Sequence, residues 1–420
     1  MRVLVVSNVY PPLGLGGYEE LCIGAVEGLR ERGHDLRVLT STYGLKRPTI
    51  EGHVHRVLTL ETPDFHRPAR HRFIEKNVRE WRSLSAFSAA TREFRPELVF
   101  FWNMGNLTRS LIQTAQAPGV PWKTAFYLSD DWVLHKPLDS WIEKRPKSRL
   151  IRIGKATLRP LLEQVPVLAG GTIRIANASF VSRSLLKQHV DAGVEPRNPR
   201  VIFNRVPIAD FEGDPRRSRD GRVRLLYLGQ ILPHKGVHTV IEAMDLIGGR
   251  SAERRRNDVI LEIVGPAAGA YRDRLESMIR EAQLEAAVRI RGRVGRSEVA
   301  ELLLAHDVLV LPSIWEEPFS VVLMEAMSTG IAVAGTTRGG SAEILRDGDN
   351  ALAFEAEDPG GCARALIRLA DDPELRRRLG ESARSLIHSR FRVEQMVDEI
   401  EELLLDALHD RAPSNAAVQP

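Results

Sequence analysis

Residues 311–345 read LPSIWEEPFSVVLMEAMSTGIAVAGTTRGGSAEIL and place a short loop between a buried strand and an apolar helix. Pro318 keeps Glu317 out of the α region, so the loop stays extended to that point and a helix can begin at Phe319 or Ser320. The first N–H groups of such a helix point back toward the loop, where they can bind an anion. Because the next residues are apolar on nearly every side of the helix, we expect it to be buried.

One carboxylate lies inside this apolar helix. Glu325 stands in its middle, where a charge is costly unless a partner binds it. A phosphate suits the helix N-terminus, and Glu317 and Glu325 can accept hydrogen bonds from hydroxyl groups. The alternative is a core helix whose carboxylate pairs with an arginine from elsewhere in the chain. The spacing of two glutamates alone leaves both interpretations open.

The wider pattern resembles a known family. Glu317-x7-Glu325 is followed by Gly339-Gly340-Ser-Ala-Glu343, which is similar to the signature of retaining, nucleotide-sugar-dependent glycosyltransferases of family 4, the group 1 glycosyltransferases. The similarity extends over nearly the whole chain, to about residue 404. It implies the GT-B fold, an α/β architecture with two doubly wound Rossmann-like domains facing each other across a cleft.

Composition limits the class of protein and its surroundings. The chain has 420 residues, 43% of them hydrophobic, and a net charge of only +4. This length suggests two domains, and the small, dispersed charge gives little support to binding of nucleic acid. Cys22 and Cys362 are too few for a disulfide framework, so a reducing compartment fits. Without a signal peptide or an apolar run of ~20 residues, we expect a soluble, cytoplasmic protein.

The order of predicted strands and helices supports two domains. Arg2–Ser7 reads as a buried strand that enters a glycine-rich turn and a helix, and a second βα series begins at Val223–Leu228. The last two strands of the first half are predicted at Ala178–Ser182 and Arg200–Asn204. The predicted organisation is an N-terminal acceptor-side domain over 1–208, a linker over 209–221, a nucleotide-sugar-binding domain over 222–385, a C-terminal helix over 386–408 returning to the first domain, and a disordered tail over 409–420.

A basic segment, KRPKSRLIRIGKATLR, occupies residues 144–159. Its leucines and isoleucines are interspersed with lysine and arginine, as in segments that lie on anionic membranes. A solvated basic face is the commoner explanation for such a pattern. Peripheral contact with the inner face of a membrane is the second interpretation.

The family resemblance assigns roles to residues of the second half. Glu317 would hold the hydroxyls of the donor sugar and Glu325 those of the ribose, while Lys235 would bind the diphosphate. Gln230 stands where the family has an arginine, so it offers a hydrogen bond but no charge. The remaining donor contacts implied are the base, near Gly292 and Val294, and the helix N-terminus formed by Phe319, Ser320 and Val321.

In the first half, the resemblance points to two loops. Gly16 and Gly17 match the glycine loop that faces the donor phosphates and the acceptor. The loop after the strand ending at Leu128 usually carries His-Asp, and here Ser129 takes the place of the histidine while Asp130 matches. His135 is a weak substitute for that histidine. We therefore assign Glu317, Asp130 and Ser129 to the catalytic group.

We expect no metal cofactor. Lys235 and a helix N-terminus can supply the positive groups that a diphosphate needs, and Asp347-Gly-Asp349 is more simply a turn than a metal ligand pair. The expected partners are a nucleotide sugar and a saccharide, lipid-linked or small-molecule acceptor. Two alternatives to a transferase are a sugar-nucleotide epimerase of the same architecture and a catalytically silent homologue that binds nucleotide sugars. Turnover would exclude the silent homologue, and a product with the sugar on a new acceptor would exclude the epimerase.

Overall fold

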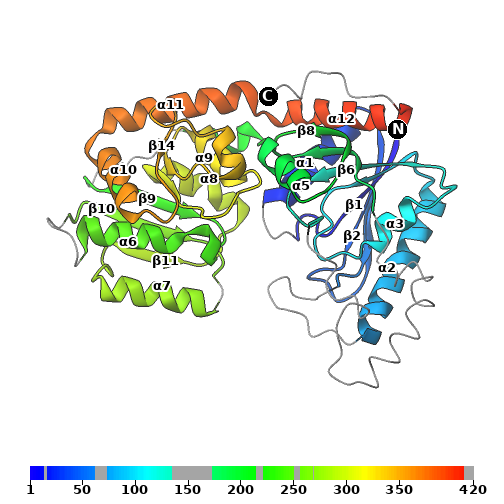
Figure 1. Cartoon of the computed structure of the whole chain (residues 1–420), viewed down its shortest axis with the longest axis horizontal. Helices are drawn as coiled ribbons and strands as arrows, with labels where there is room; N and C mark the ends of the chain where they lie inside the picture. The colour runs from blue at the N-terminus through cyan, green and yellow to red at the C-terminus, as the bar shows by residue number, and fades with distance from the viewer. Residues whose placement is uncertain are drawn as a thin grey trace. The chain divides into compact units, whose positions relative to one another are not determined.

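In the computed structural model (Figure 1), the chain forms two compact α/β units. Unit 1 combines Met1–Ile202 with the chain from Val397 onward, and unit 2 is Phe203–Met396. The division therefore falls next to Ile202 and within the last helix. The structure describes residues 1–13, 17–61, 73–134, 173–213, 221–249, 256–267 and 269–410.

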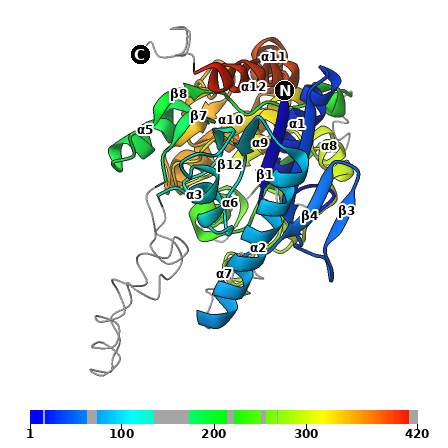
Figure 2. The same ribbon diagram turned by 90° about the vertical axis from the view of Figure 1, so that its right-hand side faces the viewer.

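Unit 1 is built on an eight-stranded sheet in the order β3-β4-β2-β1-β5-β6-β7-β8. All neighbouring strands are parallel except β3 and β4, an antiparallel pair at one edge (Figure 2). The strands are β1 Arg2–Ser7, β2 Asp35–Ser41, β3 Thr49–Glu51, β4 Val54–Leu58, β5 Leu98–Phe101, β6 Lys123–Leu128, β7 Ala176–Phe180 and β8 Arg197–Val201. The helices are α1 Gly17–Glu31, α2 Phe73–Phe94, α3 Ser110–Ala115 and α5 Arg183–Asp191.

Unit 2 is built on a six-stranded parallel sheet in the order β11-β10-β9-β12-β13-β14. The strands are β9 Val223–Leu228, β10 Val259–Val264, β11 Val288–Arg291, β12 Val308–Leu311, β13 Ala332–Gly335 and β14 Leu352–Ala353. Short aliphatic runs form these strands because helices cover both faces of a parallel sheet. The helices are α6 Val237–Gly248, α7 Gly269–Glu281, α8 Arg296–Ala305, α9 Val321–Thr329, α10 Pro359–Asp371 and α11 Pro373–Arg390.

The last helix, α12 (Val393–His409), contributes its later turns to unit 1. Arg32 donates to Glu401 at 2.5 Å and to Asp398 at 2.6 Å, and Arg200 pairs with a further carboxylate of the helix. Val397 packs so closely against Gly28 that a Cβ at the glycine would meet its side chain at 2.7 Å. Ion pairs and close packing thus hold this helix to α1, to Arg32 just after it and to β8 of unit 1.

The two parallel, Rossmann-like sheets confirm the predicted α/β fold class. Several predicted elements were wrong. The last two strands of unit 1 begin and end earlier than the predicted 178–182 and 200–204. The pairing of β7 with β6 ends at Phe180, opposite Leu128, and β8 pairs with β7 from Arg197 to Val201. The strands β3 and β4 and the helix α2 were not predicted.

Three predicted features lie partly or wholly outside the described residues. The basic segment 144–159 is one of them, and 214–220 of the predicted linker and 411–420 of the predicted tail are the others. Within the described part of that linker, Ile208–Phe211 form a short 3-10 helix, η1. No helix among the described residues is both long and apolar enough to span a membrane.

Candidate active site

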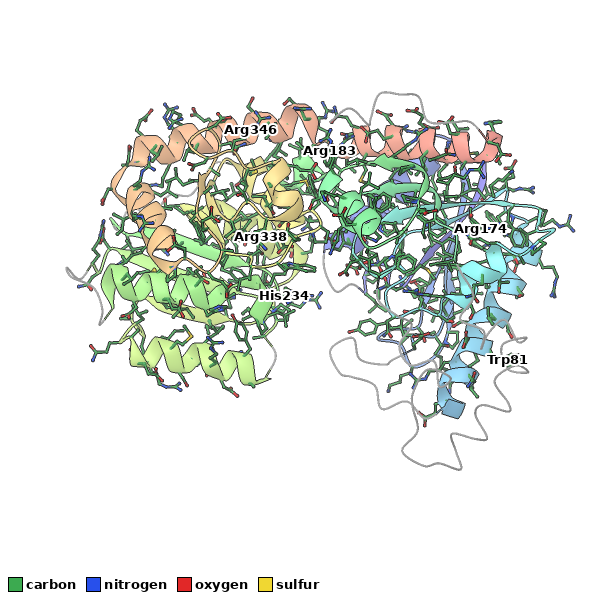
Figure 3. The ribbon with its side chains drawn as sticks, viewed as in Figure 1. Trp81, Arg174, Arg183, His234, Arg338 and Arg346 are labelled. Carbon is green, nitrogen blue, oxygen red and sulfur yellow. The ribbon has the colours of Figure 1, made fainter. Side chains whose placement is uncertain are left out.

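Apart from Gly16 and Gly17 of unit 1, the predicted donor residues lie in α9 or in loops that follow strands of the second sheet. These loops come after β9, β11, β12 and β13, so they gather at the carboxyl edge of unit 2, where ligands bind in open α/β sheets. His234 and Arg338, labelled in Figure 3, belong to two of these loops. The fold therefore brings together segments that are more than a hundred residues apart in the chain.

Two adjacent glycines fix the backbone of the loop after β12. Gly339, in the left-handed region at φ +57°, donates its N–H to Glu316 Oε2 at 2.6 Å, and Gly340 N donates to Glu317 O at 2.6 Å. A Cβ on Gly340 would lie 2.1 Å from Pro318 O, and one on Gly339 would lie 2.3 Å from Glu317 O. Only glycine permits this approach, which explains why the Gly-Gly pair follows the glutamate loop in the sequence.

Replacing Gly340 by alanine should destabilise unit 2 by about 1–3 kcal/mol, the usual cost of forcing an extra methyl group into a packed site. The new Cβ meets backbone as well as the Phe319 ring, so the loop must move. Gly292→Ala is the matched control, because nothing lies within 4 Å of a Cβ there. Thermal unfolding measures both variants, and an equal melting temperature for Gly340→Ala and the native protein would contradict this packing.

Glu317 and Lys235 form an ion pair at the centre of this edge. Lys235 Nζ lies 2.6 Å from Glu317 Oε1, and Ser313 Oγ donates to the same oxygen at 2.5 Å. The side chains of Lys235 and Glu317 are only 20% and 10% exposed. Burial raises the pKa of Glu317, but the Lys235 charge and the hydrogen bonds from Lys235 and Ser313 outweigh it, so the pKa is lowered and the carboxylate stays ionised.

The loop after β9 places Lys235 at this point. Pro233–Lys235 form a 3-10 turn, η2, and Ile314 N donates to His234 O at 3.0 Å, which joins this turn to the loop after β12. Gly236 follows at φ +70°, where a Cβ would lie 2.0 Å from Pro312 O. The lysine ammonium also lies 5.1 Å from the centre of the Trp315 ring, a cation–π contact.

The N-terminus of α9 opens beside this pair. Ser320 is the N-cap, and its Oγ accepts from Leu323 N at 3.3 Å. The first intrahelical bond runs from Met324 N to Ser320 O, so the N–H groups of Val321 and Val322 precede it. Both of these valines are half-buried. Within the described parts of the chain, two backbone donors of the first turn are thus left for an anion.

Phe319 serves the core with its side chain. The ring is fully buried and lies 5.1 Å from the Phe203 ring and 6.0 Å from the Phe391 ring, measured between centroids. Its carbonyl accepts from Asn204 Nδ2 at 3.1 Å. Any ligand contact by Phe319 must therefore come from its backbone N–H.

Glu325 has an arginine partner that the sequence did not identify. Its Oε1 pairs with Arg296 Nη1, and the guanidinium carbon of that arginine lies 5.2 Å from the Phe211 ring centroid. Glu325 is 4% exposed. This is the core-helix alternative left open by the glutamate spacing. The available signal was that Arg296 follows β11 at the same sheet edge as α9.

The other predicted donor residues occupy neighbouring loops. Gln230, the second residue after β9, is half-buried, and its carbonyl accepts from Tyr227 Oη at 2.7 Å. Gly292 and Val294 lie between β11 and α8, with Gly292 exposed and Val294 half-buried. The structure thus places all three at the edge that holds the Glu317–Lys235 pair.

In unit 1, the predicted residues follow β1 and β6. Gly17 is the first residue of α1, whereas Gly16 and His135 lie outside the described residues. Ser129 is fully buried, and its Oγ has no hydrogen-bond partner among the described residues. Asp130 Oδ1 accepts from Trp132 N at 3.1 Å, so this carboxylate shapes its own loop. Direct contact of Ser129 with a substrate would need this loop to move.

Arg109 holds the end of the same loop. Its Nη2 donates to Trp132 O at 2.8 Å and to Val133 O at 3.1 Å. Burial lowers the pKa of the arginine, although the Glu61 charge opposes this. No sequence pattern indicated this contact, because Arg109 belongs to a different segment, the one after β5.

Asp347 and Asp349 each accept a hydrogen bond from another residue of unit 2. Asp347 Oδ1 accepts from Ala353 N at 2.9 Å, and Asp349 Oδ1 accepts from Ser382 Oγ at 3.1 Å. Gly348 between them adopts φ +73°. These contacts are those of a turn.

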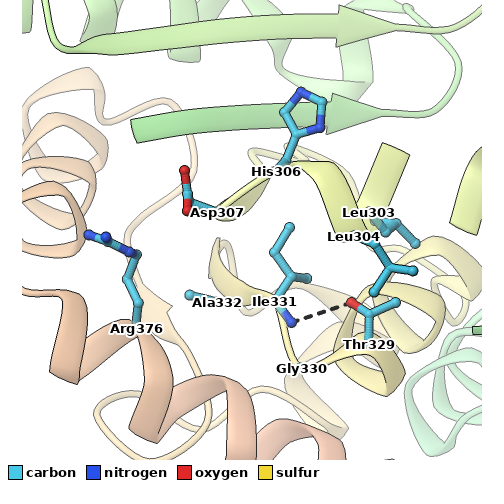
Figure 4. Close-up of a pocket in the computed structure, with 9 residues that line it drawn as sticks. All are labelled: Leu303, Leu304, His306, Asp307, Thr329, Gly330, Ile331, Ala332 and Arg376. Atoms are coloured by element: carbon cyan, nitrogen blue, oxygen red, sulfur yellow. Dashed lines mark hydrogen bonds between the residues drawn. The ribbon is translucent and has the colours of Figure 1, made fainter. Parts of the chain in front are cut away.

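A small pocket of unit 2 lies at the opposite end of the strands (Figure 4). Asp307 and Ile331 in its lining directly precede β12 and β13, and the dashed line marks the bond from Ile331 N to Thr329 Oγ1 at 3.3 Å. This position at the amino ends separates the pocket from the candidate site.

Comparison with known proteins agrees with this arrangement. Residues 210–386 match the family model for glycosyl transferases group 1. Glycogen synthase of Mycobacterium tuberculosis is 25% identical over 409 residues, covering 93% of this chain and 91% of its own. Sucrose-phosphate synthase from Thermosynechococcus elongatus has a TM-score of 0.71 at 18% identity, covering 97% of this chain and 99% of its own. Anabaena HepE in complex with UDP-glucose has a TM-score of 0.66 at 18% identity, covering 97% and 100%.

The fold is that of the GT-B glycosyltransferases, and the family match and the full-length relative support a glycosyltransferase. More particularly, the carboxyl edge of unit 2 described above lies within residues 210–386, the part of the chain that matches the model for glycosyl transferases group 1.

Proposed function

We propose that this protein transfers a hexose from a nucleotide sugar to an acceptor, without a metal and with retention of the anomeric configuration, as family 4 enzymes do. The observation that carries the proposal is the buried Glu317–Lys235 pair beside the N-terminus of α9. Glycogen synthase, the full-length relative, and HepE, described in complex with UDP-glucose, support a nucleotide-sugar donor.

The pair suits the two halves of such a donor. A diphosphate carries about two negative charges, which Lys235 and the N–H groups of Val321 and Val322 can neutralise. Glu317 can accept hydrogen bonds from sugar hydroxyls with its second oxygen, because Lys235 and Ser313 both donate to Oε1. A bound diphosphate would then compete with Glu317 for the lysine.

Retention does not need a protein nucleophile in this proposal. Glu317 is already engaged by Lys235 and Ser313, and Asp130 is engaged by the backbone of its loop. The acceptor would attack from the side of the leaving group, with a diphosphate oxygen taking its proton. Such a mechanism does not require the side chain at position 129 to transfer a proton or form a bond to the sugar. A serine there, in place of the family's histidine, is therefore compatible with activity.

The acceptor is proposed to be a saccharide, a lipid-linked saccharide or a small molecule. The first test is a thermal-shift panel of UDP, GDP and ADP, followed by hydrolysis assays on the sugar form of each nucleotide that binds. We expect one nucleoside diphosphate to stabilise the protein and its sugar form to turn over. Binding without turnover would favour the silent homologue, and conversion of the donor without transfer would favour an epimerase.

Activity should survive a chelator. Among the described residues, no three His, Cys, Asp or Glu side chains gather in a way that could hold a metal ion, whereas Lys235 and the α9 N-terminus offer positive groups. Turnover rates measured with and without excess EDTA should therefore agree within about twofold. Complete loss that Mg²⁺ or Mn²⁺ restores would overturn the metal-independent proposal.

A further inference from the structure

A basic groove lies on unit 1, at the opposite end of the strands from Gly17, Ser129 and Asp130. It runs along the amino ends of β1, β5 and β6, between the last turn of α2 and the end of α12. The groove encloses about 710 Å³. Its lining is Arg2, Ser88, Thr91, Arg92, Arg95, Pro96, Glu97, Pro121, Trp122, Lys123 and Leu408. The predicted acceptor-side loops follow the opposite, carboxyl ends of β1 and β6.

Positive charge dominates this groove. Among the described residues, no acidic side chain pairs with the guanidinium groups of Arg2, Arg92 or Arg95. Lys123 pairs with Asp410 at 2.6 Å, and Glu97 accepts the backbone N–H of Arg2 at 2.7 Å. Four cationic side chains and two carboxylates leave a net charge of about +2, concentrated on three arginines.

The end of α2 accounts for part of this charge. Arg92 lies in the last turn, and Arg95 N closes the helix on Thr91 O at 2.9 Å, so both arginines can offset the negative end of the helix dipole. Arg2 is the first residue of β1, so its charge does not offset a helix dipole. Helix capping therefore does not explain why three arginines converge on one groove.

Four of the residues that line the groove, Pro96, Pro121, Trp122 and Leu408, are apolar. Trp122 is half-buried, held by its Nε1 bond to Ala115 O at 3.0 Å and by edge contact with Phe87, and it lies beside Pro96, Pro121 and Leu408. A fixed indole next to guanidinium groups suits a ligand with a phosphate at one end and a sugar or polyol face at the other. Arginine is well suited to bind a phosphate with two parallel hydrogen bonds.

We propose that this groove binds a phosphomonoester of a sugar or polyol, at a site separate from donor binding. Arg2, Arg92 and Arg95 bind the phosphate, and the Trp122 side of the groove receives the carbon skeleton. The phosphate could belong to a free sugar phosphate or to the headgroup of a lipid, and the chemistry at the three arginines is the same.

The test is a calorimetric titration of the full-length protein with glucose 6-phosphate. The double variant Arg92→Gln, Arg95→Gln should bind it at least about tenfold more weakly, because two charged hydrogen-bond donors are lost. Arg82→Gln is the matched control, since this arginine is exposed on the same helix about 15 Å from Arg92. Its affinity should stay within about twofold of the native value.

Vesicles that contain phosphatidic acid form the second arm of the experiment. Binding to glucose 6-phosphate identifies a soluble ligand, and binding only to the vesicles identifies a headgroup, provided that the double variant loses either one. Equal losses in the double variant and in Arg82→Gln would mean general attraction of anions and would overturn the proposal. So would the failure of native protein to bind either probe. Thermal unfolding of each variant checks that it is folded.

Discussion

Replacing Glu317 by glutamine lowers the rate of sugar transfer by about 10²–10³, the usual loss when a preorganised polar group at a reacting centre is removed. Glutamine keeps the size of the side chain but removes the charge that pairs with Lys235 at 2.6 Å. The lysine, freed from its partner, can still bind a diphosphate. We therefore expect the loss to appear in kcat, with nucleoside diphosphate affinity equal or higher.

The control for this variant is Glu301→Gln, which removes the same charge from an exposed position on α8. Its rate should equal that of the native protein. Full activity in Glu317→Gln would show that this carboxylate does not contact the reacting sugar. A matching fall in melting temperature would instead point to damage to the loop after β12.

Replacing Lys235 by methionine weakens binding of the nucleoside diphosphate by about 1.5–3 kcal/mol, the usual contribution of a charged hydrogen bond. Methionine keeps an apolar stem against Trp315 but offers no charge to the phosphates. The structure adds a second effect, because the change leaves the buried Glu317 carboxylate without its cation. Breaking such a pair costs about 3–5 kcal/mol of folding stability.

These two effects can be separated through pH. In the native protein the lowered pKa of Glu317 contributes stability that is present above the ordinary glutamate pKa and is lost as the pH falls through the lowered value. In Lys235→Met, burial without the lysine raises that pKa, so stability is lost as the pH rises through it. In denaturant unfolding, the native protein should lose stability as the pH falls below the ordinary glutamate pKa, whereas Lys235→Met should lose stability as the pH rises above that pKa.

The double variant Lys235→Met, Glu317→Gln completes the comparison. It removes both charges, so the unpaired carboxylate and the reversed pH trend should disappear while nucleotide binding stays weak. Unchanged affinity in Lys235→Met would contradict the role of the lysine in donor binding. Recovery of affinity in the double variant would assign the loss to Glu317 instead.

Much of unit 2 could be predicted from the sequence. Its strands are short aliphatic runs that end in loops, and such runs mark buried parallel strands whatever their partners are. Pro318 predicted the start of α9 at Phe319 or Ser320, and the structure begins the helix one residue after Ser320, at Val321, with Ser320 as N-cap. Local backbone rules decide these features, so they are visible in a single segment.

Side-chain pairing was less predictable. Lys235 and Glu317 are 82 residues apart, and they meet because β9 and β12 are neighbours in the sheet. Arg296 reaches Glu325 because α8 and α9 both start at the carboxyl edge. Each of these four charged residues lies in a segment whose own sequence does not indicate its partner. The strand order of the sheet identifies the partner.

The elements of unit 1 that were missed have weaker local patterns. The helix α2 carries many charged residues and an exposed Trp81, and its apolar face is small, so the segment reads as polar and basic. The basic groove draws its arginines from β1 and from the end of that helix. Such a cluster has no signature in the sequence, because no one segment contains it.

The central proposal is retaining sugar transfer at the Glu317–Lys235 edge, and NMR of the anomeric proton tests it most directly. The native protein is incubated with the nucleotide sugar that the panel identifies, and the first-formed product or free sugar is observed before mutarotation. We predict an α-configured product from an α-linked donor, with the signal suppressed in Glu317→Gln. A first-formed β product would contradict retention, and an unchanged signal in Glu317→Gln would contradict the assignment of the reaction to this site.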